Sequence, residues 1–353
     1  MIELNVERRV VRLLKEYISI PSVSGEEREF AERYASDLER AGLEVEVDEL
    51  GNVIARRGDP RVCLTSHLDT VPPDGMEDPF EPRVRDGRIY GRGACDAKAN
   101  LAVYVVVAEL WDGPLEIIGV VREETDSAGV KRVLEEGKMV SDNVINGEPT
   151  GLRPVIGHKS RAEVRLRIRG KPRHASSDHP DNPIVRFCRV LERLRERARQ
   201  YEDELGRPTV VPTRVVSESR ATNVTPGELE AVLDVRLNTE LSLDELREML
   251  EEECERVEVR AGAPPFKLRG DEAVVRALER ALDKFGLPTE PVVWPASTDA
   301  GYIRHLGGKD VVVFGPGSIK YAHTPKEHVP IPELVTAVHV LREVVNELSQ
   351  GCA

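Results

Sequence analysis

The sequence predicts an α/β domain with a mixed sheet, into which a smaller ferredoxin-like α+β domain is inserted. Helix-like and strand-like stretches alternate up to residue 158 and again from residue 266, which indicates a layered α/β domain. Between these parts the expected elements follow the order β-α-β-β-α-β, which is typical of the split ferredoxin-like unit. The chain has 353 residues, enough to bury a core in each part. We therefore expect a discontinuous main domain, 1–158 and 266–353, and an insertion, 159–265.

The main domain is expected to begin with two helices. Apolar residues recur at helical spacing over 5–18, and a second helix should lie between Gly25 and Gly42, where the second glycine is a stop signal. The elements that follow are expected to be strands at 44–47, 52–56 and 62–67, a helix from Ala99 to Leu110, and a strand at 115–121. This last strand is apolar almost throughout, so both of its faces should be covered.

The insertion is predicted from a change in periodicity. In 161–169, R-A-E-V-R-L-R-I-R, charged and apolar residues alternate strictly, as on a strand with one buried face. The rest of the insertion is expected to contain a helix at 182–201, strands at 209–218 and 228–238, a helix at 242–254 capped by Ser242, and a strand at 257–261. After it we expect a helix at 271–285, strands at 292–294 and 311–314, and a last helix from Ile331.

Composition excludes several classes of partner. Acidic residues outnumber basic ones by 63 to 50, and the net charge of −13 argues against nucleic acid or an anionic membrane as a general partner. No apolar run could span a bilayer, and the N-terminus lacks a signal-peptide profile. The five cysteines have no paired spacing, so reduced thiols in a cytoplasmic protein are expected.

Acidic and imidazole side chains follow predicted strand ends or turns at five places. They are His67 and Asp69 in S-H-L-D-T, Asp96 in G-R-G-A-C-D-A-K, Glu123-Glu124 in V-V-R-E-E-T, Glu148 in N-G-E-P-T-G, and His323 in Y-A-H-T-P. Oxygen and imidazole ligands without thiolate suit a pair of divalent ions such as zinc. Two acids remain beyond the ligand set, and a hydrolase needs such acids to handle protons. The chain is therefore predicted to be a metal-dependent hydrolase.

The same residues agree with the chemistry of amide hydrolysis. Two divalent ions can share a water, lower its pKa and polarise a scissile carbonyl, while a free carboxylate moves the proton to the leaving amine. Successive side chains on an extended strand point apart, so Glu124 can bind metal while Glu123 faces the substrate. Asp69, two residues after His67, should accept the imidazole N–H of His67.

At these residues the sequence resembles the M20 family of metallopeptidases and amidohydrolases. The motifs S-H-L-D-T-V-P, G-R-G-A-C-D-A-K, E-E, G-E-P-T-G and H-T-P-K-E occur in the family's order and approximate spacing, over nearly the whole chain. The resemblance implies a dinuclear centre with the ligands His67, Asp96, Glu124, Glu148 and His323, in which His67 and Glu148 bind different metals and Asp96 bridges both. His328 is a possible competitor of His323, and the H-T-P match favours His323.

The resemblance also assigns roles outside the ligand set. It implies that Glu123 is the general base, that Asp69 orients His67, and that the Asp96–Ala97 peptide bond is cis. The metal expected from this chemistry is zinc, and the same ligands would also suit cobalt or manganese.

The insertion resembles the family's dimerisation domain. G-K-P-R-H-A-S places His174 where relatives stabilise the tetrahedral oxyanion in a neighbouring subunit's site, which implies a homodimer. A-T-N-V-T-P and L-D-V-R imply that Asn223 and Arg236 hold a substrate carboxylate. Arg236 is equally plausible as an ion-pair partner near Asp234.

Three further substrate contacts are expected from the resemblance. A-S-T-D-A at 296–300 matches a turn where Ser297 or Thr298 bonds the substrate. His158-Lys159 replaces an Arg-Gly pair of several relatives, so Lys159 could act there as a point charge without bidentate geometry.

The resemblance is strongest to one group of substrates. D-A-K in place of D-M-K, the short chain and the compact insertion resemble hydrolases that release lysine or ornithine from an amino-group carrier protein in lysine and arginine biosynthesis. The alternatives are a small-molecule deacylase of acetylornithine or succinyl-diaminopimelate type, and a dipeptidase or carboxypeptidase. A metal-binding protein without catalysis is a further alternative, and it would need neither Glu123 nor Asp69.

One strand of the insertion carries a basic face. Arginines 161, 165, 167 and 169 share that face with Glu163 as its only acid. On a chain of charge −13 this face could dock an acidic carrier protein. The alternative is a solvated sheet face whose arginines pair with acids on neighbouring strands.

Overall fold

A computed structural model describes residues 2–177 and 180–350, and the chain forms two compact units. The first unit comprises the residues up to 156, 268–292 and those from 302 on, and the second comprises 157–267 and 293–301. The expected insertion, 159–265, therefore lies within the second unit. That unit also includes 293–301, which the sequence assigned to the main domain.

A mixed sheet has the strand order β1-β2-β6-β3-β7-β15-β8-β13, and β14 pairs with β8. The strands are β1 Glu44–Val47, β2 Val53–Arg57, β3 Val62–His67, β6 Leu115–Val120, β7 Asn143–Asn146, β8 Val155–His158, β13 Phe266–Lys267, β14 Val292–Trp294 and β15 Asp310–Val313. The central strands β6, β3, β7 and β15 run parallel, whereas β1, β2, β8 and β13 pair antiparallel. Every residue of β6 is buried, as its apolar sequence predicts.

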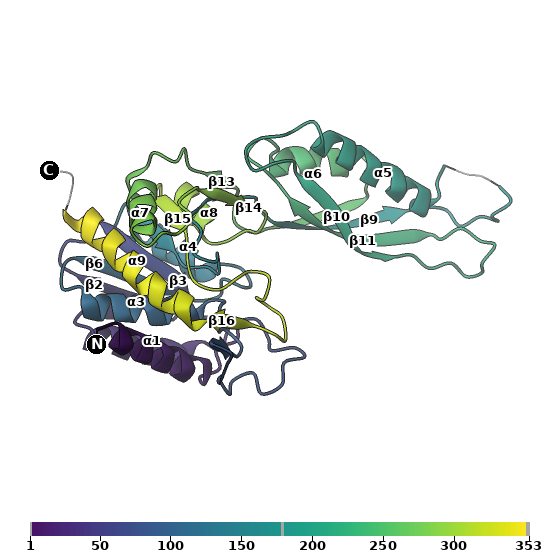
Figure 1. Cartoon of the computed structure of the whole chain (residues 1–353). Helices are drawn as coiled ribbons and strands as arrows, with labels where there is room; N and C mark the ends of the chain where they lie inside the picture. Colours follow the sequence, from purple (N-terminus) through teal and green to yellow (C-terminus); the bar gives the residue numbers. More distant parts are fainter. Residues whose placement is uncertain (1, 178–179, 351–353) are drawn as a thin grey trace. The chain divides into compact units, whose positions relative to one another are not determined.

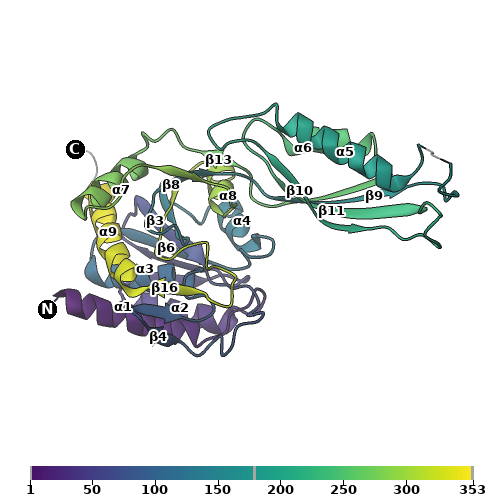
Figure 2. The same ribbon diagram turned by 45° about the vertical axis from the view of Figure 1, so that its right-hand side comes forward.

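Helices of the first unit pack on this sheet and on one another. They are α1 Ile2–Ile18, α2 Arg28–Arg40, α3 Lys98–Leu110, α4 Ala128–Glu135, α7 Ala273–Lys284, α8 Ala300–His305 and α9 Ile331–Gln350, of which α8 begins in the second unit. Figures 1 and 2 show α1, α3 and α9 side by side, and α7 contacts α9. Because α3 lies within this layer, its apolar residues are buried on all sides.

A small sheet in the first unit was not expected from the sequence. It has the order β16-β5-β4, with β4 Arg83–Arg85, β5 Arg88–Tyr90 and β16 His328–Pro330. Residues 88–90 thereby pair with 328–330, so the segment before Asp96 lies next to the segment after His323. This pairing brings together two motifs that are far apart in the chain.

The second unit contains the predicted order β-α-β-β-α-β. Its elements are β9 Ala162–Arg169, α5 Pro183–Ala198, β10 Thr209–Val216, β11 Glu228–Arg236, α6 Leu243–Glu251 and β12 Arg256–Ala261. The sheet order is β10-β11-β9-β12 and each pairing is antiparallel. Asn182 caps α5 and, as predicted, Ser242 caps α6 by accepting the N–H of Glu245.

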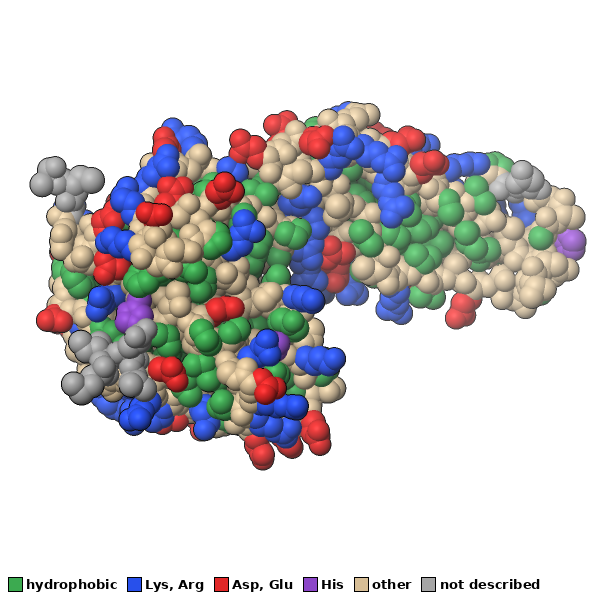
Figure 3. Space-filling view, viewed as in Figure 1, with side chains coloured by type: hydrophobic (Ala, Val, Ile, Leu, Met, Phe, Trp, Pro, Cys, Tyr) green, Lys and Arg blue, Asp and Glu red, His purple; other side chains and the backbone are tan. Residues whose placement is uncertain are grey.

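One face of this second sheet is a core and the other is charged. Leu166 of β9 and Leu233 of β11 pack with Phe187 of α5 and Leu246 of α6, all nearly inaccessible to solvent. The alternate residues point the other way, because side chains alternate along a strand. Figure 3 shows acidic and basic side chains interleaved over the surface.

The remaining fold expectations concern thiols and membranes. Cys63, Cys95, Cys188 and Cys254 are free thiols, and Cys352 lies outside the described residues. Within the described residues, no helix has both the length and the apolar character needed to cross a membrane.

Candidate metal centre

Three predicted ligands meet at the carboxyl ends of the parallel strands. His67 ends β3, Asp96 lies in the turn before α3, and Glu124 lies in the turn after β6. One ligand atom from each of them lies within 4.8 Å of the others, and His67 and Asp96 are buried. Parallel strands end at the same edge of a sheet, so His67 and the residues after Val120 must be neighbours.

His323 joins this group from the far end of the chain. Its Nε2 lies 3.0 Å from Oδ2 of Asp96 and 2.7 Å from Oε1 of Glu124. His328, the competitor weighed above, instead places its ring against Tyr90 and Tyr321. The structure therefore brings His323 to the two acids.

Glu148 is buried two residues beyond the end of β7, where the sequence placed it. The side-chain amide of Asn146 lies 3.5 Å from its Oε1. Its charge acts on His67: burial alone would lower the pKa of His67, but hydrogen bonds to Asp69 and Asp96, together with the charge of Glu148, raise it well above its ordinary value. Glu148 thus belongs electrostatically to the same cluster.

Asp69 makes a different contact from the one expected. The Nδ1 of His67 lies 2.8 Å from the backbone carbonyl of Asp69, whereas the carboxylate Oδ1 is 3.5 Å away. A carbonyl can only accept, so Nδ1 donates to it. Nε2 donates to Asp96 when the ring is protonated and can bind a metal when it is not. The orientation of His67 by Asp69 is retained, but the backbone contributes the closer contact.

The carboxylate of Asp69 mainly holds the Glu123-Glu124 turn. Oδ1 accepts the backbone N–H of Glu123 at 3.0 Å, and Oδ2 accepts that of Glu124 at 3.1 Å and the hydroxyl of Ser24 at 2.6 Å. Burial works against ionisation, but the hydrogen bonds from His67, Ser24 and Glu124 hold the pKa of Asp69 below its usual value. A buried anion is therefore stabilised where it ties three segments together.

The expectation that Glu123 and Glu124 extend a strand was wrong. β6 ends at Val120, Arg122 has a φ of 63°, and both glutamates lie in a turn. The backbone of the two glutamates is thus held by the turn and by the hydrogen bonds to Asp69, and not by strand pairing. Glu123 is half-buried.

The carboxylates of the cluster favour the binding of a cation. Although burial opposes it, contacts with His323 and His67 hold the pKa of Asp96 well below its ordinary value. Burial and the charge of Asp96 raise the pKa of Glu124, and hydrogen bonds to Asp96 and Glu124 raise the pKa of His323 to about 10. Without metal, protons on the imidazoles neutralise these acids. Carboxylate and imidazole donors without thiolate fit divalent ions such as zinc, which would replace those protons.

A comparison with known protein families identifies the family of this chain. The model of the peptidase family M20/M25/M40 matches residues 63–347, a span that includes every residue of this cluster. This chain belongs to the M20 family. The cis peptide bond between Asp96 and Ala97, which the resemblance implied, is present.

Relatives and solved structures agree with the M20 assignment. A Pyrobaculum aerophilum protein with the provisional name LysW-lysine/LysW-ornithine hydrolase is 32% identical over 96% of this chain and 97% of its own. Acetylornithine deacetylase of Myxococcus xanthus is 32% identical over 89% and 90%. A dinuclear metal-binding M20 peptidase of Bacillus subtilis matches the fold with a TM-score of 0.73 at 20% identity, over 99% of each chain. M20 membership makes this protein a metal-dependent hydrolase of amide bonds.

The other predicted M20 site residues belong to the second unit. His174 is exposed, and its Nε2 lies 3.3 Å from the side-chain amide of Asn223, so these two predicted residues are neighbours. The Nδ1 of His174 lies 2.8 Å from the hydroxyl of Ser176. Their roles at the metal centre stay predictions.

Lys159, Ser297 and Thr298 have local partners. The ammonium of Lys159 donates to the carbonyl of Arg207, and Ser297 donates to the carbonyl of Ala263 at 3.4 Å. Thr298 is buried, and its N–H donates to Nε2 of His158 at 3.3 Å. A substrate would have to compete with these contacts.

Arg236 is engaged as the alternative interpretation expected. Its Nε lies 2.7 Å from Oδ1 of Asp234 and its Nη2 3.2 Å from Oδ2, a bidentate pair. Arg161 approaches the same carboxylate at 3.5 Å. The structure thus gives Arg236 a partner within its own strand.

Sequence reasoning missed three residues beside the centre. Ser24 hydrogen-bonds to Asp69, and the buried pair of Arg92 and Glu327 contacts the backbone of Asp96. Glu327 is the last residue of the H-T-P-K-E motif, which was the only available signal for it.

Proposed function

We propose that this M20 hydrolase holds two divalent ions and releases lysine, ornithine or both from an amino-group carrier protein. The observation that carries the dinuclear site is the position of Asp96. Its Oδ1 lies 3.1 Å from Nε2 of His67, and its Oδ2 lies 3.0 Å from Nε2 of His323. A carboxylate that faces two imidazoles with different oxygens is suited to bridge two cations.

The contacts of His323 and the charge that acts on His67 favour a division of the ligands that differs from the expectation above. His323 contacts Glu124 as well as Asp96, whereas the charge of Glu148 acts on His67. We therefore assign His67 and Glu148 to one ion and His323 and Glu124 to the other, with Asp96 shared. Zinc suits these donors, and cobalt and manganese are compatible with them.

We assign a catalytic task to each of the other predicted residues, Glu123, Asp69 and His174. Two bound divalent ions would supply the Lewis acidity that polarises the scissile carbonyl. Glu123 accepts the proton of the attacking water and delivers it to the leaving amine. Asp69 holds the turn that carries Glu123 and fixes the ring of His67. His174 stabilises the negative oxygen of the tetrahedral intermediate in a neighbouring subunit.

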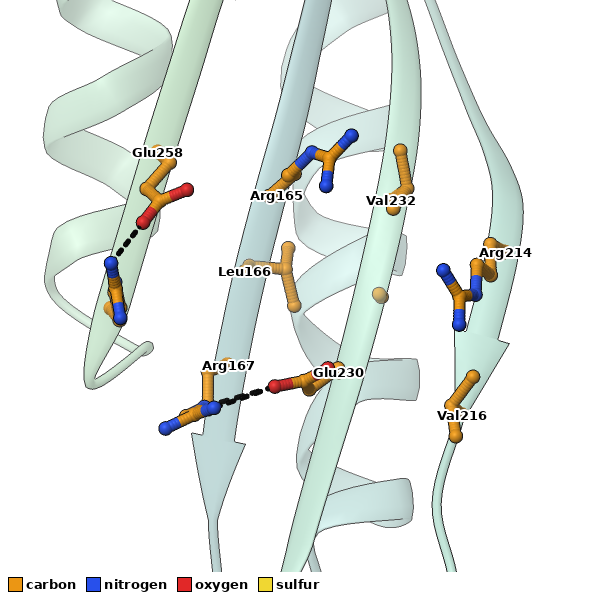
Figure 4. A pocket seen from close by; sticks show the side chains of 10 residues that line it. Arg165, Leu166, Arg167, Arg214, Val216, Glu230, Val232 and Glu258 are labelled. Atoms are coloured by element: carbon orange, nitrogen blue, oxygen red, sulfur yellow. Dashed lines mark hydrogen bonds and ion pairs between the residues drawn. The ribbon is translucent and has the colours of Figure 1, made fainter.

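The carrier as substrate is supported by similarity and by a groove of charged residues. The similarity is to the Pyrobaculum protein, whose name includes both LysW-lysine and LysW-ornithine. The groove, of about 200 Å³, lies on the open face of the second sheet and is shown in Figure 4. We call it the arginine groove, and its charged residues are Arg165, Arg167, Arg214, Arg256, Glu230 and Glu258.

The arginine groove has four basic and two acidic side chains, so its local charge is opposite to that of the chain. Arg167 pairs with Glu230 at 2.7 Å, and Arg165 pairs with Glu163 at 2.8 Å. The alternative interpretation, pairing with an acid on a neighbouring strand, therefore holds for Arg167, whereas Arg165 pairs with an acid of its own strand. Arg256 also pairs with Glu258, as Figure 4 shows. Exposed ion pairs contribute only about 0–1 kcal/mol each, so an acidic carrier can exchange them for its own carboxylates.

The decisive assay compares carrier-linked lysine, acetylornithine and succinyl-diaminopimelate on the same preparation. The proposal predicts the highest kcat/KM for carrier-linked lysine or ornithine. Reversal of Arg165 and Arg214 to Glu should raise KM for the carrier-linked substrate on the order of tenfold and leave the small substrates unchanged. Arg189→Glu together with Arg193→Glu, an equal charge change on exposed residues of α5, is the control. Equal effects on all substrates would reject docking in the groove.

A small-molecule deacylase is the second candidate. It is favoured by acetylornithine deacetylase of Myxococcus xanthus, which is as similar in identity as the Pyrobaculum protein. Turnover of acetylornithine that exceeds turnover of carrier-linked lysine would establish it. Preferred cleavage of unmodified dipeptides or of a C-terminal peptide bond would support the peptidase alternative.

A homodimer through the second unit completes the proposal. β10 ends the sheet order and exposes Val211 and Val215, and α5 exposes Ile184 and Val185. An exposed apolar strand edge is suited to pair with the same edge of a second copy.

The dimer can be tested through His174. Mixing Glu123→Gln and His174→Ala subunits creates heterodimers in which one site has both native residues. If His174 acts in the neighbouring subunit, random mixing should restore about a quarter of the native activity. If it acts within its own subunit, mixing will restore none.

A further inference from the structure

A buried ion pair of the first unit lies against the backbone of Asp96. The side chain of Glu327 is 0% exposed and that of Arg92 is 1% exposed, and Nη1 of Arg92 donates to Oε2 of Glu327. The other oxygen, Oε1, accepts the N–H of Cys95 at 3.1 Å and that of Asp96 at 3.2 Å. One carboxylate thus accepts from one guanidinium nitrogen and from two backbone N–H groups.

The pair joins the two chain segments that carry the facing ligands. Glu327 comes four residues after His323, and Arg92 comes four residues before Asp96. The backbone N–H of Gly91 also donates to the carbonyl of Glu327 at 3.4 Å. The distance between His323 and Asp96 therefore depends on contacts made by Glu327.

Stability alone does not explain this arrangement. A buried ion pair is weak evidence for stability, since apolar residues of similar volume often serve as well. This carboxylate is, in addition, placed in a cluster that already contains Asp96, whose like charge opposes it. Its direct contact with the amide of Asp96 indicates a geometric role.

We propose that Glu327, held by Arg92, is a positioning residue that sets the carboxylate of Asp96 between His67 and His323 and so determines how tightly the metals are bound. The inference rests on the ligand roles proposed above. Partners that orient metal ligands from outside the coordination shell typically affect metal affinity by about 10–100-fold.

The chain contains a matched control at the other end of the sheet. Glu116 of β6 is 0% exposed, pairs with Nε of Arg56 at 2.9 Å, and accepts the N–H of Val140 at 3.1 Å and of Ser141 at 3.0 Å. It has the same chemistry as Glu327 but lies near the start of β6, whereas the ligands follow its end.

The experiment compares Glu327→Gln with Glu116→Gln in the full chain. Zinc affinity and stoichiometry are measured by competition with a chromophoric chelator, and stability by denaturant unfolding of the metal-free protein. Both variants should lose comparable stability, but only Glu327→Gln should weaken zinc binding, by about 10–100-fold. Equal zinc affinity in the two variants would overturn the proposal.

A double variant separates positioning from folding. Arg92→Met with Glu327→Met removes both charges, so the protein should fold even if Glu327→Gln does not. The acceptor for the amides of Cys95 and Asp96 is then missing, and zinc binding should stay weak. Native zinc affinity in the double variant would contradict the inference. A native protein that binds no zinc would instead refute the proposed ligand set itself.

Discussion

The two units differ in how their functional candidates are held. In the first unit, His67, Asp69 and Asp96 are all buried and have two or more hydrogen-bond or ion-pair partners. In the second, His174 and Asn223 are exposed and contact each other. Metal ligands need fixed positions in a dry environment, whereas groups that meet a substrate or a second subunit need to be accessible.

The two units therefore support their proposed roles in different ways. The roles proposed in the first unit are supported by contacts among the residues themselves. The roles in the second unit depend on a substrate or a second subunit that must displace local contacts, such as the pair of Arg236 with Asp234. Variants in the first unit should therefore have large effects on metal binding or turnover, and variants in the second should have effects specific to the substrate.

The largest effect is expected for Asp96→Ala. It removes a carboxylate that contacts both His67 and His323, so binding of both ions and activity should fall below detection. Metal content by atomic emission is the measurement. Asp37, an equally buried acid that pairs with Arg33 within α2, provides the control: Asp37→Ala should lose stability but retain both ions. Undiminished metal content in Asp96→Ala would contradict the expectation that variants in the first unit have large effects on metal binding.

Glu123→Gln should separate metal binding from turnover. The amide cannot accept the proton of the water, so kcat should fall by about 10²–10⁴-fold while both ions stay bound. Single-turnover kinetics with parallel metal analysis will check this. A kcat near that of the native protein would remove Glu123 as the base.

Asp69→Asn should have a smaller effect. The variant loses the charge that holds the Glu123-Glu124 turn and that favours the proton on Nδ1 of His67. We expect kcat/KM to fall by about 10–100-fold and the optimum zinc concentration to rise. Ser24→Ala removes one of the donors to Asp69 and should reproduce the effect weakly. If Asp69→Asn were fully active, the turn would not need this anchor.

The smallest effect is expected for Arg236→Ala. Because Arg236 is already paired with Asp234 and Arg161 also approaches that carboxylate, its loss should change kcat/KM by less than about fivefold. Steady-state kinetics on a carboxylate-bearing substrate is the measurement. A rise in KM of tenfold or more would show that Arg236 holds substrate. A residue of the second unit would then have an effect as large as those expected in the first unit.

Most of the larger elements could be predicted from periodicity. The strict alternation of 161–169 predicted β9, and the apolar stretch 115–121 predicted β6 with both faces covered. The small sheet could not be predicted in this way. Its strands have three residues each, and β16 pairs with β5 across more than two hundred positions, so no local pattern reveals it.

The candidate site was predictable in its residues and less so in its contacts. His67, Asp96, Glu124 and His323 were identified from motifs and do converge. The turn at Glu123 was not predictable, because it depends on a residue with positive φ at Arg122. The contact of Glu327 with Asp96 joins positions 231 residues apart and arises only in the folded chain.

The central claim is that Asp96 lies between two cations, and anomalous diffraction from zinc-soaked crystals tests it most directly. Data collected on both sides of the zinc absorption edge should show two peaks that share the carboxylate of Asp96, one beside His67 and Glu148 and the other beside His323 and Glu124. A single peak, or peaks that do not contact Asp96, would contradict the account.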